Sequence, residues 1–180
     1  MRSLKKAFRK ADEYKTPSIL VEVLVPFIEE WKVKNSKNPT IWCPFDRDES
    51  NYVQIFKKHG YNVINSHIQD GRDFFLYSPQ EYDLVISNPP FSLKKEIFER
   101  LVSLKKPWLM LMNMMAINYQ NIGGLFATLD DKIQYLIVDK KVSFNGHTSS
   151  FNSSYVCWNF LEKTKHIHLE DNNSGQFFRP

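Results

Sequence analysis

The stretch Tyr82-Asp83-Leu84-Val85-Ile86-Ser87-Asn88-Pro89-Pro90-Phe91 decides the fold. Its apolar run, residues 84–86, predicts a short buried strand, and two prolines that cannot donate to a sheet ladder end that strand at Asn88. From Ser92 onward, apolar residues recur at the spacing of a helix with one buried face. Residues 88–91 are therefore predicted to form a strand-to-helix loop. In an open α/β sheet such a loop lies at the carboxyl ends of the strands, where ligands bind.

This loop resembles the catalytic loop of S-adenosylmethionine-dependent amino-methyltransferases. The resemblance is closest to the N6-adenine nucleic-acid methyltransferases, whose tetrapeptide reads Asp/Asn/Ser-Pro-Pro-Tyr/Phe/Trp. It implies that Asn88, Pro89, Pro90 and Phe91 are catalytic and that Asn88 also borders the cofactor. The cofactor implied is S-adenosylmethionine.

The chemistry of adenine explains these residue types. Its exocyclic amine is a poor nucleophile because the lone pair is delocalised into the ring, so a catalyst has to hold both N–H groups. The Asn88 side-chain oxygen and the Pro89 carbonyl can accept those two hydrogen bonds. Phe91 offers a flat apolar face for a base flipped out of a duplex. The alternative is a Pro-Pro turn in which Asn88 caps the following helix and Phe91 packs as core.

Composition favours a single folded domain with a polyanionic partner. The 180 residues include 42% hydrophobic and 14% aromatic residues, enough to fold, and no apolar run reaches the length of a membrane span. A cytoplasmic location is therefore the expectation. Net charge is +4 and the pI about 8.9, which fits a nucleic-acid partner. Cys43 and Cys157 lack metal-ligand spacing and are expected to be buried thiols, so no metal is expected.

Three segments are expected along the chain. Residues 1–11 form a basic arm, residues 12–162 form the methyltransferase domain, and residues 163–180 form a polar, partly disordered tail. At the start of the domain, Thr16 as N-cap and Pro17 at the first helical position predict a helix that Pro26 kinks. This element resembles the N-terminal cofactor-binding segment of the same family, which implies cofactor contacts from Tyr14, Thr16 and Pro17. The alternative is that Thr16 and Pro17 only mark the start of a helix and bind no cofactor.

The loop after the first predicted strand, residues 40–43, departs from the family. There the family reads Asp-Pro-Phe-x-Gly-x-Gly, whereas this chain reads Cys-Pro-Phe-Asp-Arg-Asp-Glu over residues 43–49. Side chains at the glycine positions crowd a ligand that lies on the backbone. Either Pro44 and Asp46 line a modified cofactor site, or the site is degenerate. Residues 41–46, together with residues 12–17 and 87–91, also resemble segments of small methyltransferase-like proteins of phages and prophages. That resemblance extends over most of residues 12–161.

Two further positions are candidates for cofactor binding. Residues 61–65 predict a second strand, after which Ser66 stands where such folds carry an acidic ribose ligand. The alternative is that Ser66 is simply a polar residue at the end of a strand and binds no ligand. The segment Gly71-Arg72-Asp73-Phe74-Phe75 resembles the motif in which an Asp reads the cofactor adenine and an apolar neighbour packs on its ring, which implies Asp73 and Phe74. An ordinary turn is the alternative there.

The remaining pattern predicts strands at 108–111, 133–138 and 155–161, a helix over 118–129 and a long polar loop over 140–154. The expected fold is α/β: a Rossmann-like methyltransferase fold with a mostly parallel seven-stranded sheet, helices on both faces and a C-terminal antiparallel hairpin.

The function predicted is methylation of the N6 amine of adenine in nucleic acid, in DNA rather than RNA, by direct transfer to a flipped-out base. No separate target-recognition domain is apparent, so a protein partner or the loop at 140–154 is expected to supply recognition. Two alternatives stay open. One is a non-catalytic relative that serves as a nucleic-acid-binding or interaction module, and the other is the same chemistry on a protein amide or an RNA adenine.

Overall fold

A computed structural model describes residues 15–115, 120–129, 132–144, 147–148 and 152–169. In chain order the elements are α1 (Ser18–Glu22), α2 (Val25–Asn35), β1 (Thr40–Cys43), α3 (Asn51–Lys58), β2 (Asn62–Asn65), η3 (Ile68–Asp70), β3 (Leu84–Ser87), η4 (Phe91–Leu93), α4 (Lys94–Leu104), β4 (Trp108–Asn113), α5 (Gln120–Phe126), β5 (Ile133–Val138), β6 (Ser143–Phe144), β7 (His147–Thr148), β8 (Ser153–Trp158) and β9 (Lys165–Ile167). Strands and helices alternate in the first half, as the sequence predicted. Within these ranges no helix is long and apolar enough to cross a membrane.

Seven of the strands form one sheet in the order β2-β1-β3-β4-β8-β5-β9. The β2–β1, β1–β3, β3–β4 and β5–β9 pairs are parallel, while β8 is antiparallel to both β4 and β5. Six strands thus run one way and β8 runs against them, which gives the mostly parallel sheet that we predicted. The chain passes from β1 to β2 on one side and then to β3 on the other side of β1. This change of direction makes the carboxyl ends of β1 and β3 the place where an open sheet binds ligands.

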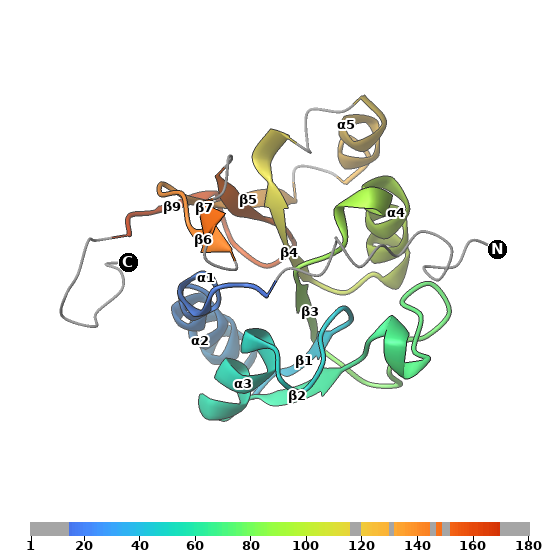
Figure 1. Cartoon of the computed structure of the whole chain (residues 1–180), viewed down its shortest axis with the longest axis vertical. Helices are drawn as coiled ribbons and strands as arrows, with labels where there is room; N and C mark the ends of the chain where they lie inside the picture. Colours follow the sequence, from blue (N-terminus) through green and yellow to red (C-terminus); the bar gives the residue numbers. More distant parts are fainter. Residues whose placement is uncertain (1–14, 116–119, 130–131, 145–146, 149–151, 170–180) are drawn as a thin grey trace.

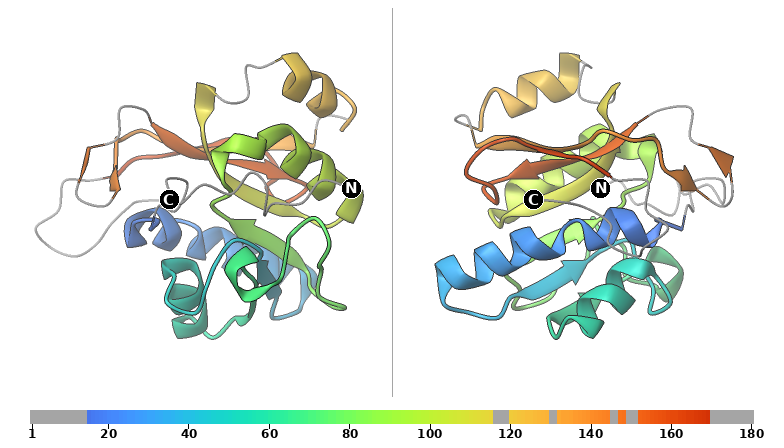
Figure 2. Two further views of the ribbon diagram at one scale, coloured as in Figure 1. Left: turned by 45° about the vertical axis from the view of Figure 1, so that its right-hand side comes forward. Right: turned by 90° about the vertical axis from the view of Figure 1, so that its left-hand side faces the viewer.

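Helices cover both faces of the sheet (Figures 1 and 2). Successive side chains of a strand point to opposite faces, so each face carries apolar side chains that a helix layer buries. In β1, Ile41 and Cys43 join a core under α1, α2 and α3, whereas Trp42 between them joins a second core under α4 and α5. The other central strands alternate in the same way. Burial on both faces explains why the strands read as apolar runs without polar alternation.

The first helical segment differs from the sequence prediction at its start. Pro17 is the N-cap of α1 and no side chain caps it, so the expected Thr16 cap is wrong. The Thr16 hydroxyl instead contacts Asn88. The chain also breaks into two helices before Pro26, which takes a first-turn position of α2. A proline is tolerated there because a first-turn N–H has no intrahelical partner.

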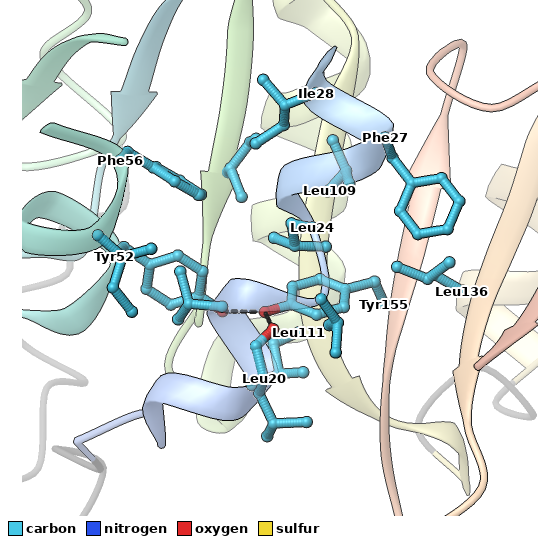
Figure 3. Close-up of a cluster of buried hydrophobic side chains, with 14 of the residues drawn as sticks. Leu20, Leu24, Phe27, Ile28, Tyr52, Phe56, Leu109, Leu111, Leu136 and Tyr155 are labelled. Carbon is cyan, nitrogen blue, oxygen red and sulfur yellow. Dashed lines mark hydrogen bonds between the residues drawn. The ribbon is translucent and has the colours of Figure 1, made fainter. Parts of the chain in front are cut away.

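Two buried tyrosines join three elements inside the first core (Figure 3). The Tyr155 hydroxyl of β8 donates to the Leu20 carbonyl at 2.7 Å and lies 2.8 Å from the Tyr52 hydroxyl of α3. Because the Tyr155 proton goes to Leu20, Tyr52 donates the bond between the two rings. Burial raises the pKa of both phenols, so both stay neutral at physiological pH. The pair ties α1, which leads out of the candidate site, to the centre of the sheet.

The last strand corrects one expectation. β9 lies within the segment from residue 163 that we expected to be a polar tail, and it pairs in parallel with β5 at the edge of the sheet. The sheet therefore continues beyond the domain boundary expected at residue 162. The expected basic arm and residues 170–180 lie outside the described residues. Within the loop over 140–154, β6 and β7 form a small separate hairpin.

Candidate active site

The loops after β1 and β3 meet at the point where the sheet changes direction. Strand β3 ends at Ser87, and its loop supplies Asn88, Pro89 and Pro90 before η4 begins at Phe91. The β1 loop supplies Pro44 and Asp46. Thr16, just before α1, reaches the same place through its contact with Asn88. The structure therefore brings together side chains from three separate parts of the sequence.

Asn88 presents a buried acceptor at this edge. Its Nδ2 donates to the Thr16 hydroxyl at 3.1 Å, while its Oδ1 is buried and accepts no hydrogen bond from the described residues. Neither η4 nor α4 is capped by a side chain, so the alternative in which Asn88 caps the following helix fails. A buried carbonyl oxygen without a donor costs about 1–3 kcal/mol. Such an oxygen is suited to an incoming N–H group.

Asp46 and Ser87 form a second buried contact beside Asn88. The Ser87 hydroxyl donates to Asp46 Oδ2, and both side chains are buried. Burial raises the pKa of Asp46 to about 6, although hydrogen bonds from Ser87 and Ser50 oppose the rise. The carboxylate is thus ionised at neutral pH in a place that disfavours a negative charge. A cationic ligand group would offset that cost.

The β1 loop adopts its shape without glycine. Among the described residues, positive φ angles occur only at Ser36, Lys105, Asn159, Gly60 and Gly71, and none of these lies between residues 44 and 50. Side chains fix the loop instead. Arg47 forms ion pairs with Glu49 at 3.5 Å and with Asp70 at 3.8 Å, and the Ser50 hydroxyl caps α3 by accepting from the Val53 N–H. The departure from the family motif is therefore compatible with an ordered loop.

The predicted ribose ligand, Ser66, is already engaged. It is almost fully buried, and its hydroxyl accepts a hydrogen bond from Trp42 Nε1 at 3.0 Å. This contact satisfies an indole N–H in the second core, so Ser66 has a structural role that neither the ribose contact nor simple strand-end polarity describes. A ribose contact from Ser66 stays a prediction.

Asp73 and Phe74 are both buried. Asp73 Oδ1 accepts from the Phe75 N–H at 3.0 Å, the local turn expected for such a residue. The Phe74 ring is fully buried, with ring centroids 5.6 Å from Trp42 and 4.8 Å from Phe45. In this structure Phe74 presents no open face to a cofactor, whereas Phe45, in the β1 loop, is partly exposed. The role of Phe74 in packing against the adenine ring stays a prediction.

Phe91 is the first residue of η4, directly after the loop that contains Asn88. It is partly exposed, and the Lys94 Nζ lies 5.8 Å from its ring centroid. Pro89 and Pro90 are buried, and Pro17 is partly exposed. Tyr14 lies outside the described residues. Phe91 also packs in part against the second core, which agrees with the alternative that it serves as core, so stacking of a base on Phe91 stays a prediction.

The donor set fits S-adenosylmethionine in part. The buried Asp46 carboxylate suits a positively charged group of such a molecule, whereas the unpaired Asn88 oxygen suits an N–H group of the methyl acceptor. Ser66 and Phe74 offer less, because their side chains are already in contact within the core. Across the described ranges, no three His, Cys, Asp or Glu side chains are grouped so that they could hold a metal ion.

Sequence reasoning missed two residues of this network. Ser87 directly precedes Asn88, and that adjacency was a usable signal, because residues at a strand end border the same loops. Asn51 donates from Nδ2 to the Thr16 carbonyl at 2.7 Å. Nothing in the local sequence marks Asn51, since it looks like an ordinary first residue of a helix.

Comparisons with solved structures agree with this architecture. A chain described as a modification subunit of a putative type I restriction enzyme from Vibrio vulnificus YJ016 matches with a TM-score of 0.57 and 10% identity, over 97% of this chain and 50% of that one. A chain described as a putative class I S-adenosylmethionine-dependent methyltransferase from Listeria monocytogenes matches with a TM-score of 0.54 and 10% identity, over 92% of this chain and 68% of that one. These matches show a Rossmann-like methyltransferase fold. The chain spans half the length of the Vibrio protein.

A search of curated proteins found no match. A family model does match, and its description is "Adenine-specific methyltransferase EcoRI". It covers residues 76–169, just over half of the chain, and includes the strand and loop that carry Asn88 and Phe91. A closer relation to phage proteins stays a prediction. On this match, together with the fold and the Asn-Pro-Pro-Phe loop, the chain belongs to the adenine-specific methyltransferase family of the EcoRI type.

Proposed function

We propose that this protein methylates the N6 amine of adenine in DNA, with S-adenosylmethionine as the methyl donor. The observation that carries the proposal is the Asn88 side chain: its oxygen is buried and unpaired within the described chain, and its nitrogen is held by Thr16. Membership of an adenine-specific family supports adenine as the acceptor. The basic charge supports a nucleic-acid acceptor, and the structural neighbour described as a modification subunit of a putative type I restriction enzyme supports DNA over RNA.

The residues of the site would act by orientation. Asn88 Oδ1 accepts one N–H of the adenine amine and the Pro89 carbonyl accepts the other, which directs the nitrogen lone pair out of the ring plane. Asp46 would lie beside the cationic donor. S-adenosylmethionine, held beside Asp46, would supply an electrophilic methyl group: the new N–C bond would form as the S–C bond breaks, with S-adenosylhomocysteine as the leaving group. The methylated amine then loses its extra proton to water, so no general base is needed. Positioning is the main contribution to rate.

Base flipping is part of the proposal because the amine lies inside a duplex. Phe91 would stack against the flipped base, and Lys94, close to that ring, would lie near the backbone phosphates. Sequence recognition would come from the loop over residues 140–154 or from a partner protein. Each base step unstacked costs a few kcal/mol, which stacking on Phe91 partly offsets.

The test is a methylation assay with isotope-labelled S-adenosylmethionine. DNA of mixed sequence and matched RNA are incubated with the protein, digested to nucleosides and analysed by mass spectrometry. Labelled N6-methyladenine in the DNA digest is the expected result. Label in RNA alone would move the acceptor to RNA, and label in protein alone would favour an amide acceptor.

The second candidate is a non-catalytic relative that binds nucleic acid or another protein. The engaged Ser66 hydroxyl, the buried Phe74 ring and the side chains at the family's glycine positions favour it. Titration calorimetry separates the two functions. Micromolar binding of S-adenosylmethionine supports the enzyme, whereas no heat at millimolar ligand supports the non-catalytic module.

Replacing Phe91 with alanine should raise the KM for DNA by about 5–100-fold. Stacking of one base on an aromatic ring contributes about 1–3 kcal/mol, and each 1.4 kcal/mol corresponds to a factor of about ten. Phe91→Trp keeps a stacking face and should keep KM within about threefold. Steady-state kinetics with varied DNA concentration measures both.

Phe160→Ala is the matched control. Phe160 is also a partly exposed aromatic residue, but it follows β8, which is antiparallel to β4, so it lies beyond the amino ends of the parallel strands and its loss should leave KM unchanged. If Phe91→Ala and Phe160→Ala gave the same KM as the wild type, Phe91 would not stack on the base.

A further inference from the structure

We propose that Asn51 and Thr16 are positioning residues that hold the amide of Asn88 for methyl transfer. This inference rests on the proposed function. It assigns Thr16 a role different from the cofactor contact that the family resemblance implies, and it brings in Asn51, which no motif marks. The two residues link the start of α3 to the loop after β3.

The first link is between Asn51 and Thr16. Asn51 is the first residue of α3, and its Nδ2 donates to the Thr16 carbonyl at 2.7 Å. Helix α3 is itself fixed by the Ser50 cap and by four buried residues against the first core. A residue on a rigid helix end therefore holds the backbone of Thr16, which has no helical hydrogen-bond ladder of its own because α1 begins at Ser18.

The second link is between Thr16 and Asn88, 72 positions apart in the sequence. Thr16 is 5% exposed, so its hydroxyl is shielded from water and its contact with Asn88 Nδ2 at 3.1 Å is not exchanged for solvent. With Nδ2 engaged, Oδ1 is the end of the amide that remains for an N–H of the acceptor. A free amide would populate other χ2 angles, since that torsion has broad minima.

The two hydrogen bonds, from Asn51 to Thr16 and from Asn88 to Thr16, form what we call the relay. It affects the rate because methyl transfer depends on the alignment of the amine with the donor. An error of about 1 Å in the position of a reacting group can cost about 100-fold in rate. Thr16 does not touch the reacting atoms in this arrangement, so its loss should lower kcat and leave the KM values for donor and DNA nearly unchanged. Loss of a cofactor contact would instead raise the KM for the donor.

The variants are Thr16→Val, which keeps the shape and removes the hydroxyl, and Thr16→Ser, which keeps the hydroxyl. Thr16→Val should lower kcat by about tenfold or more, and Thr16→Ser should restore most of it. In an Asn88→Ala background Thr16→Val should have no further effect, because the group that it positions is gone. Asn51→Ala should act in the same direction as Thr16→Val, more weakly.

Nuclear magnetic resonance of the protein alone gives a second readout that needs no activity. The side-chain amide protons of Asn88 should show slowed exchange with water in the wild type and in Thr16→Ser, and faster exchange in Thr16→Val. If the wild type methylates nothing but these exchange rates hold, the proposed function fails, whereas the hydrogen bond by which Thr16 holds the Asn88 amide is upheld. Unchanged exchange in Thr16→Val, or a rise in donor KM with unchanged kcat, would overturn the relay.

Discussion

Replacing Asn88 with alanine should lower kcat for methyl transfer to adenine by about 100-fold or more. Its oxygen is the buried acceptor that the structure leaves unpaired within the described residues, and the amine needs that acceptor to free its lone pair. Removal of one such preorganised group typically costs about 100–1,000-fold in kcat. Single-turnover assays with saturating donor and DNA measure the chemical step directly.

Asn88→Asp keeps an acceptor at the same position and should retain far more activity than Asn88→Ala. Asn62→Ala is the matched control, because Asn62 is exposed at the start of β2, at the amino ends of the parallel strands and away from the loops after β1 and β3. It should keep wild-type kcat. Equal rates for Asn88→Ala and wild type would remove Asn88 from the mechanism.

Replacing Asp46 with asparagine should stabilise the protein at pH 8 and leave its stability unchanged near pH 3.5. Burial raises the pKa of Asp46 from 3.8 to about 6, so the ionised carboxylate disfavours the folded state at pH 8. The gain should be on the order of 1–3 kcal/mol, because each pH unit between the folded and unfolded pKa values corresponds to about 1.4 kcal/mol. Urea unfolding at the two pH values measures it.

The pH dependence of this stability change follows from the raised pKa of Asp46 in the folded state. A carboxyl with a raised pKa in the folded state stabilises the fold fully below pH 3.8, and this contribution is lost as the pH rises through 6. The introduced asparagine side chain would carry no charge at either pH, so the variant gains only where Asp46 is ionised. Asp48→Asn is the control, since Asp48 is exposed and should change stability by less than about 0.5 kcal/mol at either pH.

The same Asp46→Asn variant should bind S-adenosylmethionine more weakly, because it removes the anion beside the cationic donor. A gain in stability together with a loss of binding would identify Asp46 as a residue kept for function at a cost in stability. An increase in stability with wild-type affinity would make Asp46 a buried structural residue only.

Much of the fold was predictable because local patterns carry it. The apolar run at residues 84–86, its two prolines and the helical spacing that follows located the centre of the sheet. The Gly60 residue after α3 has a φ of 79°, as expected for a helix end. β9 was missed because Lys165-His166-Ile167 is short and mostly polar, and only its pairing with β5 makes it a strand.

The candidate site was predictable in its motif and not in its contacts. Asn88 and Phe91 could be named from the loop that contains them. The partners of Asn88 and Ser87 lie 72 and 41 positions away, at Thr16 and Asp46, so no local pattern reveals them. Phe74 shows the converse, since a motif that suggests a ligand contact can equally be satisfied by core packing against Trp42 and Phe45.

The single reversed strand has a consequence for how the protein folds while it is being made. β8 lies between β4 and β5, yet it is synthesised after both. Until it leaves the ribosome, β4 has an open edge and β5 has no neighbour in the sheet, and unpaired edges of this kind recruit other chains. The sheet therefore becomes continuous only when residues 153–158 enter the gap and pair with both β4 and β5.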